Sequence, residues 1–355
     1  MLSRTADHLF WMSRYTERAE NTARMLDVNY QTSLLPQSAA VAQVGWQGLL
    51  SISELLPAYI AKHCEVTPHD VLEFMIVDES NPSSIVSCLR AARENARAVR
   101  GTLTTEVWET QNQTWLEVNR MLSHREFERD PGQFFEWVKF RSHLSRGVTV
   151  GTMLMDEALH FMRLGTFLER ADNTARLVDV KFHAVQSDFF GNASEKDQEY
   201  DFYHWSAILR SVSGFEIYRK VYRDVIKPER VADLLILRAD MPRSLHASLN
   251  EVVSNLAMVA NDQSSETQRR AGKLRADLQY GDIEEILATG LHAFLTQFLD
   301  RVNELGVRIS RDFLVPAEAA GGAAVDPGVR RHSRAGGNPG LSEPGRAARS
   351  RISRW

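Results

Sequence analysis

The chain has 355 residues, of which 43% are hydrophobic and 25% are charged, a composition typical of globular proteins with one or two domains. Its formal net charge is −4, but residues 316–355 carry seven Arg and three acidic residues, so the remainder has a net charge of −8. An acidic body of this kind argues against a nucleic-acid-binding surface.

The sequence also lacks the marks of membrane and secreted proteins. No apolar run approaches the roughly 20 residues of a membrane span, and the first residues contain no apolar signal-peptide core. Cys64 and Cys88 are the two cysteines, and they lack the CxxC spacing of zinc sites and redox motifs. We therefore expect a cytoplasmic protein with no membrane contact and no cofactor.

Apolar residues at helical spacing dominate residues 1–315, and the alternation typical of strands is scarce. The sequence therefore predicts an all-α fold. The predicted helices cover residues 3–34, 41–63, 69–77, 83–100, 104–123, 131–147, 154–187, 199–225, 228–238, 243–262, 265–279 and 282–313.

The C-terminal residues 316–355 are a different kind of sequence, rich in Gly, Pro and Arg. They have few large apolar side chains to offset the entropy of ordering, so we expect a disordered tail. A basic arm that binds acidic partners is the alternative, but a solvated extension needs no partner.

Deleting residues 316–355 is therefore expected to leave the melting temperature nearly unchanged, because little in this segment can pack on the body. Thermal unfolding of the full and shortened chains measures this. A loss of more than about 2 kcal/mol, the scale of a core defect, would show that the tail docks on the body.

The most informative feature is a tract that occurs twice, at residues 17–28 and 169–180. Nine of its twelve positions are identical. Residues 68–89 also align with residues 228–249, and Trp46 and Trp205 begin similar stretches. The offset far exceeds that of a solenoid repeat. We therefore predict a duplicated helical bundle with pseudo-symmetric halves at 1–150 and 151–315.

The repeated tract allows a structural interpretation. Glu20 and Arg24 are four residues apart, and Arg24 and Asp27 are three apart, so ion pairs along one helix are expected. The two tract helices could also cross near a pseudo-twofold axis and exchange Arg–carboxylate bonds, which suit the forked guanidinium.

The functional interpretation places the polar side chains of both tracts in a shared cleft. The arginines would clamp a carboxylate or phosphate, the glutamates would orient an amine, and the asparagines would donate and accept hydrogen bonds. No nucleophile accompanies them, so binding is favoured over catalysis. The candidate binding residues are Glu17, Arg18, Asn21, Arg24, Glu169, Arg170, Asn173 and Arg176.

A metal site is not expected. Glu157 and His160 have the ExxH spacing of half a di-iron site, but the chain contains no second ExxH pair, and the position aligned with Glu157 is Thr5. The GxSxG, Walker A, GxGxxG and HExxH motifs are also missing from the sequence, so no catalytic residue is assigned.

Several stretches, in order along the chain, resemble the bacterial alpha-E family. They are residues 15–24, 93–97, 105–109, 151–153 and 168–172, and the resemblance covers about residues 1–314. It implies an all-helical cytoplasmic protein. It also implies that the protein accompanies or is fused to a circularly permuted ATP-grasp ligase, and that transglutaminase-like proteases and sometimes proteasome-like peptidases are frequent neighbours. Glu17 and Glu169 match the glutamate motif of the family, for which the resemblance implies no catalytic role.

The leading hypothesis is a helical accessory protein that binds an ATP-grasp ligase, a peptide product of that ligase, or both. One alternative is an enzyme that acts on a peptide or amide through the repeated Glu, Arg and Asn residues. A purely structural scaffold is the other.

Overall fold

The computed structural model describes residues 1–34, 39–188 and 204–314, and that part of the chain is helical without any strand, which confirms the all-α prediction. The predicted tail lies outside the described residues. Residues 204–211 are helical, and the other helices are α1 (Ser3–Ser33), α2 (Ala39–Ile52), α3 (Leu56–Ile60), α4 (Pro68–Ile76), α5 (Ile85–Ala98), α6 (Thr105–Ser123), α7 (Glu126–Arg129), α8 (Pro131–Thr152), α9 (Glu157–Asp188), α11 (Phe215–Tyr222), α12 (Pro228–Ile236), α13 (Leu245–Met258), α14 (Ser265–Gln279), α15 (Ile283–Thr289) and α16 (Leu291–Phe313).

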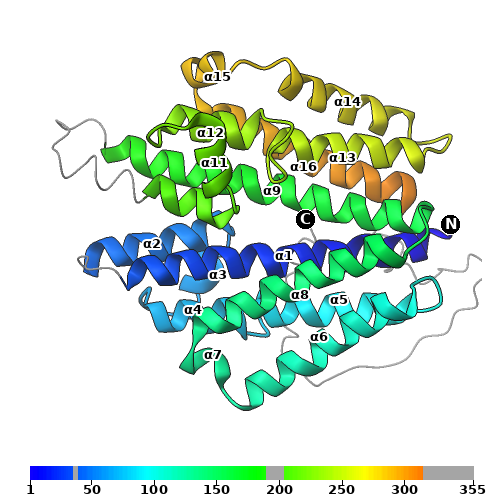
Figure 1. Cartoon of the computed structure of the whole chain (residues 1–355), viewed down its shortest axis with the longest axis horizontal. Coiled ribbons are helices and arrows are strands. Elements are labelled where there is room, and N and C mark those ends of the chain that lie inside the picture. Colours follow the sequence, from blue (N-terminus) through cyan, green and yellow to red (C-terminus); the bar gives the residue numbers. More distant parts are fainter. Residues whose placement is uncertain (35–38, 189–203, 315–355) are drawn as a thin grey trace, which may run out of the picture.

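The two long helices that carry the repeated tracts, α1 and α9, run side by side through the middle of the molecule and in the same direction (Figure 1). Helices α5 and α8 pack on α1, and α6 packs on both of them. Helices α13 and α16 pack on α9, and α14 packs on both of these. The repeated tracts therefore lie at the centre of the fold.

Helix α1 is enclosed by these neighbours along most of its length. Leu9, Phe10 and Leu26 are fully buried, but so are the charged side chains of Glu17 and Glu20. The polar side of this helix therefore faces other helices rather than water. Buried charges are costly unless they are paired, so the sequence has to supply partners for them from other elements.

A glycine brings the two central helices into close contact. A Cβ atom added at Gly165 would lie 2.2 Å from the backbone oxygen of Phe10. Glycine is the residue that allows such an approach of two backbones.

Three of the predicted helices are interrupted in the structure, because the chain turns within each predicted range. The predicted helix at 41–63 breaks after α2, where Glu54 has a φ of 55°, and the one at 199–225 breaks at Ser213, also with a φ of 55°. The one at 282–313 breaks at Gly290, whose φ is 111°. Each break had a sequence signal, because Pro57 follows the first, Gly214 follows Ser213, and Gly290 is itself a glycine.

The two predicted halves contain matched contacts. Trp46 and Trp205 are both fully buried. The hydroxyls of Tyr59 and Tyr218 each donate to a backbone oxygen a few residues later, at 3.0 and 2.9 Å. These contacts agree with the predicted duplication, which stays a prediction. In the described part of the chain, no helix combines the length and apolar character that crossing a membrane requires.

Candidate functional site

The two Glu-Arg pairs of the repeated tracts bind each other across the α1–α9 contact. Arg18 donates from Nε and Nη2 to the two carboxylate oxygens of Glu169, at 2.6 and 3.1 Å. Arg170 donates in the same way to Glu17, at 2.8 and 3.0 Å. The exchange of Arg–carboxylate bonds expected from the sequence is therefore present, with the bidentate geometry that makes such pairs strong. We call these two pairs the braces.

The carboxylates of both braces are buried and ionised. Glu169 is 5% exposed and also accepts a hydrogen bond from Arg14 Nε at 2.7 Å. Burial alone would raise the pKa of the Glu169 carboxyl, but Arg18 and Arg14 outweigh burial and lower that pKa to about 2. The pKa of Glu17 is also lowered, because Arg170 and Arg243 overcome the effect of its burial.

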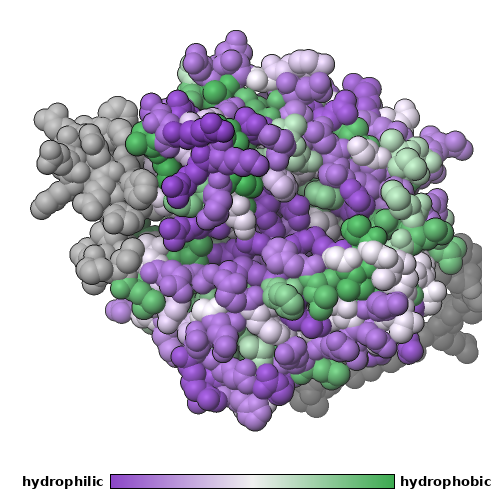
Figure 2. Space-filling view, viewed as in Figure 1, coloured by the Kyte–Doolittle hydropathy of each residue, from purple (hydrophilic) through white to green (hydrophobic). Residues whose placement is uncertain are grey.

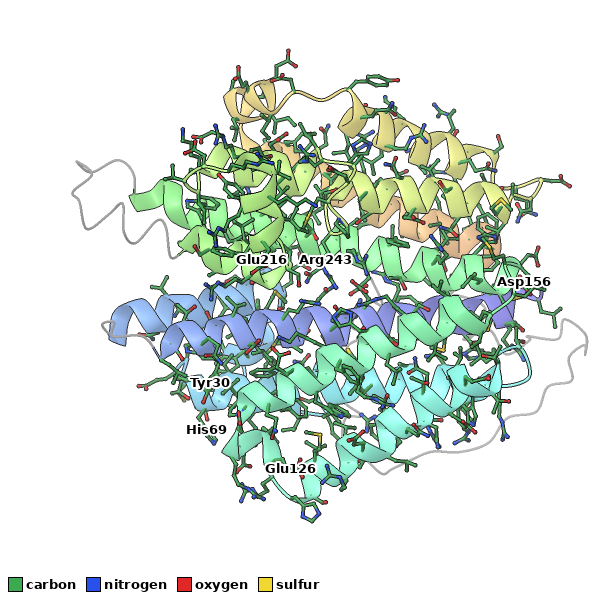
Figure 3. The ribbon with its side chains drawn as sticks, viewed as in Figure 1. Tyr30, His69, Glu126, Asp156, Glu216 and Arg243 are labelled. Atoms are coloured by element: carbon green, nitrogen blue, oxygen red, sulfur yellow. The ribbon has the colours of Figure 1, made fainter. Side chains whose placement is uncertain are left out.

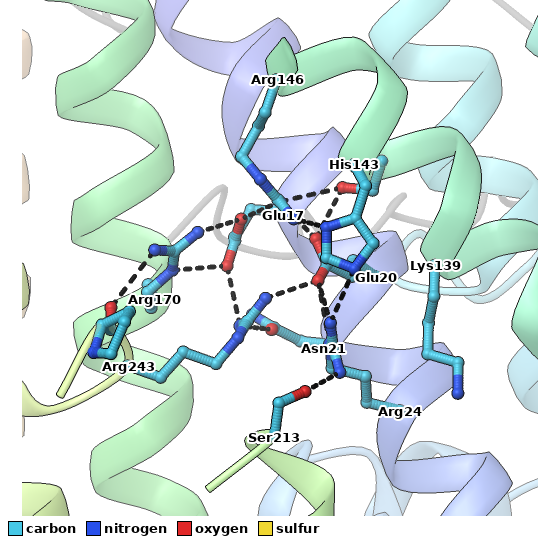
Figure 4. Close-up of polar contacts among 12 residues, drawn as sticks. Glu17, Glu20, Asn21, Arg24, Lys139, His143, Arg146, Arg170, Ser213 and Arg243 are labelled. Atoms are coloured by element: carbon cyan, nitrogen blue, oxygen red, sulfur yellow. Dashed lines mark hydrogen bonds and ion pairs between the residues drawn. The ribbon is translucent and has the colours of Figure 1, made fainter. Parts of the chain in front are cut away.

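The brace at Glu17 belongs to a larger group of charges on one side of α1 (Figure 4). Two carboxylates, those of Glu17 and Glu20, are surrounded by four guanidinium groups. We call this group the arginine cluster. The four cations are Arg24, Arg146, Arg170 and Arg243.

Arg243 reaches the centre of the cluster from the loop before α13. Its guanidinium donates to Glu17 at 3.0 Å, to Glu20 at 2.5 Å and to Asn21 Oδ1 at 2.9 Å. This loop is fixed on α9, because Thr174 donates from its hydroxyl to the backbone oxygen of Arg243 at 3.0 Å. Figure 3 shows Arg243 directed from the upper helices toward α1.

Helix α8 and the turn before α11 complete the cluster. Arg146 contacts both carboxylates and lies 2.8 Å from His143 Nδ1. Arg24 donates to Glu20 at 2.9 Å and to the Ser213 hydroxyl at 2.6 Å. Glu20 accepts from these arginines, and its pKa is held well below the usual range despite its burial, with Arg243 and Arg146 as the main causes.

The cluster carries more positive than negative charge. Four guanidiniums face two carboxylates, which leaves two positive charges in excess. Burial lowers the pKa of Arg243 to about 10, and repulsion from Arg170 and Arg24 contributes to that shift. Burial also lowers the pKa of His143, with further lowering from the neighbouring arginines, so this imidazole is neutral at pH 7.

The cluster contains no activated nucleophile among the residues that the structure describes. The Ser142 hydroxyl donates to Glu20 at 2.6 Å, but a carboxylate with so low a pKa is a poor base. The Ser213 hydroxyl accepts from Arg24. This arrangement can bind an anion, but it lacks the paired base that would activate a hydroxyl.

The second tract forms a separate site. Arg176 donates to Asp172 at 2.8 Å and contacts Glu54. It lines a cavity of about 250 Å³ together with Asp179 and Asp300 among others. Arg24 and Arg176 therefore contact different partners, so the structure does not gather all the candidate residues in one shared cleft. Asn173 is partly buried.

The sequence profile of the Alpha-E family, described as a predicted alpha-helical domain with a conserved ER motif, matches residues 1–314. The chain belongs to the Alpha-E family. The repeated tracts supply a Glu-Arg dipeptide at Glu17-Arg18 and another at Glu169-Arg170. In this Alpha-E chain these two dipeptides form the braces.

Two uncharacterized proteins, one from Mycobacterium bovis and one from Mycobacterium tuberculosis, are each 25% identical to this Alpha-E chain over 332 residues. The alignments cover 83% of the chain and 35% of each relative. The chain thus spans about a third of the length of these curated relatives. No solved structure matches the chain.

Sequence reasoning missed three arginines of this Alpha-E site: Arg14, Arg146 and Arg243. Arg243 had a faint signal, because it lies in the segment that aligns with residues 68–89, where the matching residue is Ser83. Arg14 and Arg146 had none. Their contacts depend on how α9 and α8 pack on α1, which the sequence pattern does not specify.

The ExxH pair does not form a shared ligand set. Glu157 contacts the amino group of Met1, whereas His160 lies 2.8 Å from Asn255 Oδ1. One other group of side chains in the described residues has metal-ligand spacing, at His69, Asp70 and Glu73 on α4, with ligand atoms within 4.8 Å of one another. It lies at the outer edge of the molecule (Figure 3), where such groups are common without an ion.

Proposed function

We propose that this Alpha-E chain is a non-catalytic accessory protein that binds a circularly permuted ATP-grasp ligase, the peptide product of that ligase, or both. One observation supports this most: in the part of the chain that the structure describes, the candidate site holds an excess of guanidinium groups and no activated nucleophile. Such a site suits recognition of an anionic group. The resemblance to proteins that accompany ATP-grasp ligases supplies the partner.

The roles of the Glu-Arg residues also favour binding over catalysis. Glu17 and Glu169 are buried and each is bound by two or more arginines. A carboxylate whose pKa is lowered in this way stays ionised and does not exchange protons near pH 7. The braces therefore fit a role in holding α1 and α9 together beside the arginine cluster.

The length of the relatives also supports this proposal. The chain spans about a third of each curated relative, so those proteins contain further sequence beside the matching part. This agrees with a helical unit that works next to another domain. A transglutaminase-like protease is the second partner that the resemblance implies.

Co-purification from the native host tests the proposed function. A tagged chain should retain the ATP-grasp ligase through washing, and mass spectrometry of the eluate should detect the ligase or a peptide. A tagged unrelated helical protein from the same host is the control. Peptide cleavage or ligation by the chain alone, lost in a folded Glu17→Gln variant, would favour the enzyme hypothesis. A chain that retains nothing would favour the scaffold.

A further inference from the structure

We infer that the arginine cluster is an oxyanion-binding site that takes a side-chain or terminal carboxylate of an acidic peptide. The choice of a peptide carboxylate rests on the proposed function. The oxyanion site itself rests on the contacts of the cluster. A phosphate group shares the same recognition chemistry, and the experiment below distinguishes the two.

The excess charge is the first argument. Like charges held close together in a poorly solvated site repel one another. The two carboxylates of the cluster are bound by all four arginines, and no further carboxylate of the described residues balances the two remaining positive charges. Burial and repulsion lower the pKa of Arg243 to about 10. A bound anion would remove this repulsion.

Asn21 gives an independent second argument. Its side chain is within the cluster and only 4% exposed. Its Oδ1 accepts from Arg243, which fixes the orientation of the carboxamide, and its buried Nδ2 has no hydrogen-bond partner among the described residues. A buried donor without a partner is costly. An oxyanion in contact with the cluster would accept this hydrogen bond.

The cluster can be reached from solvent. Arg146 has a side chain that is 29% exposed, and His143 and Ser213 at the border of the cluster are exposed. Figure 2 shows hydrophilic residues gathered in a recess at the middle of this face, between the helices of the two predicted halves. An anionic group can therefore approach Arg146 before it meets the buried Arg243.

The second tract makes the assignment specific to one side of the molecule. The cavity beside Arg176 is lined by three acidic residues, Glu54, Asp179 and Asp300. One guanidinium there faces several carboxylates, the reverse of the charge balance in the arginine cluster. An anion is therefore expected to bind beside α8 and not beside α16.

Calorimetric titration of the full chain with tri-glutamate, and separately with inorganic phosphate, tests the inference at pH 7 and low salt. Arg146→Gln should weaken binding by about 10-fold to 150-fold, the effect of losing one charge-assisted hydrogen bond. Arg163→Gln is the matched control, since that arginine is 31% exposed and pairs with Glu251 outside the cluster. The control should bind within about twofold of the unaltered chain, as expected for a charge remote from the ligand.

A second variant tests the site by adding a negative charge to it rather than removing a positive one. Asn21→Asp places a carboxylate of the same shape beside Arg243, so the protein supplies its own counter-charge. This variant should stay folded, should melt no lower than the unaltered chain, and should lose binding of the anion. Retained binding in Asn21→Asp would contradict the inference.

The two titrations also decide the ligand. Tighter binding of tri-glutamate supports a peptide carboxylate, whereas tighter binding of phosphate assigns the site to a phosphate group and overturns the peptide assignment. Binding of neither probe, or equal losses in Arg146→Gln and Arg163→Gln, overturns the site. These titrations test the anion site separately from the proposed function. If the chain retains the ligase in the co-purification but binds neither probe, only the anion site is refuted.

Discussion

Replacing Glu169 with glutamine is expected to destabilise the protein by about 3–5 kcal/mol, the cost of breaking a buried ion pair from one side. The carboxylate receives hydrogen bonds from Arg18 and Arg14, and the Arg14 side chain is only 5% exposed. Glutamine keeps the shape but removes the charge, so both cations lose the attraction of the Glu169 carboxylate. Urea unfolding of the two proteins measures the difference in the free energy of unfolding.

An ion pair that is about a third exposed provides the control for this change. Glu251 pairs with Arg163 at 2.6 Å, and its side chain is 35% exposed, against 6% for Glu169. Glu251→Gln makes the same chemical change where solvent screens the pair, so a loss below about 1 kcal/mol is expected. Equal losses at the two positions would show that the brace adds nothing beyond a surface pair.

The stabilising effect of Glu169 should also depend on pH. Its pKa is about 2 in the folded protein against an ordinary value of 4.5. A lowered pKa stabilises the folded state above pH 4.5, and this contribution is lost as the pH falls through 2. The unfolding free energies of the unaltered chain and Glu169→Gln should therefore converge between about pH 4.5 and 2. If the difference in unfolding free energy stayed constant between pH 4.5 and 2, the ion pair of Glu169 would not contribute to stability as described.

The sequence was sufficient to predict the all-α class and to single out the Glu and Arg residues that pair across α1 and α9. Helical periodicity is local, so α1 and α9 could be predicted to within a few residues. The repeated tract identified Glu17 and Glu169 because charged residues kept at matching positions are unusual on an ordinary helix. The i,i+4 pair of Glu20 and Arg24 was also correct, since its geometry depends on one helix alone.

The remainder of the site depends on contacts between elements distant in the sequence. Asp27 pairs with Lys139 on α8 and not along its own helix. Arg243 joins the cluster because the loop before α13 is held on α9. The alignment of its segment with residues 68–89 marked it only faintly, because the matching residue is Ser83. The functional interpretation placed the polar side chains of both tracts in a shared cleft. Those of α1 instead contact α8 and the turn at Ser213, with Arg146 partly exposed.

Replacing Gly165 with alanine is expected to destabilise the protein by about 3 kcal/mol or more, the upper end of the cost of overpacking. The new methyl group would lie 2.2 Å from the Phe10 oxygen, and no rotamer change can relieve this contact, because the helix backbones fix the position of both atoms. Helices α1 and α9 would have to separate. The braces at Glu17 and Glu169 would then lengthen, because they connect the same two helices.

The expected loss of stability is opposite to the effect of helix propensity, so the two causes can be told apart by the direction of the change. Alanine in place of glycine normally stabilises a helix interior by roughly 0.5–1 kcal/mol. Gly272 in α14 offers the matched control, because a Cβ there meets no atom within 4 Å. Gly272→Ala should raise the melting temperature while Gly165→Ala lowers it. If both changes raised it, the close contact of α1 and α9 would be wrong, and so would the bidentate geometry of the braces that depends on it.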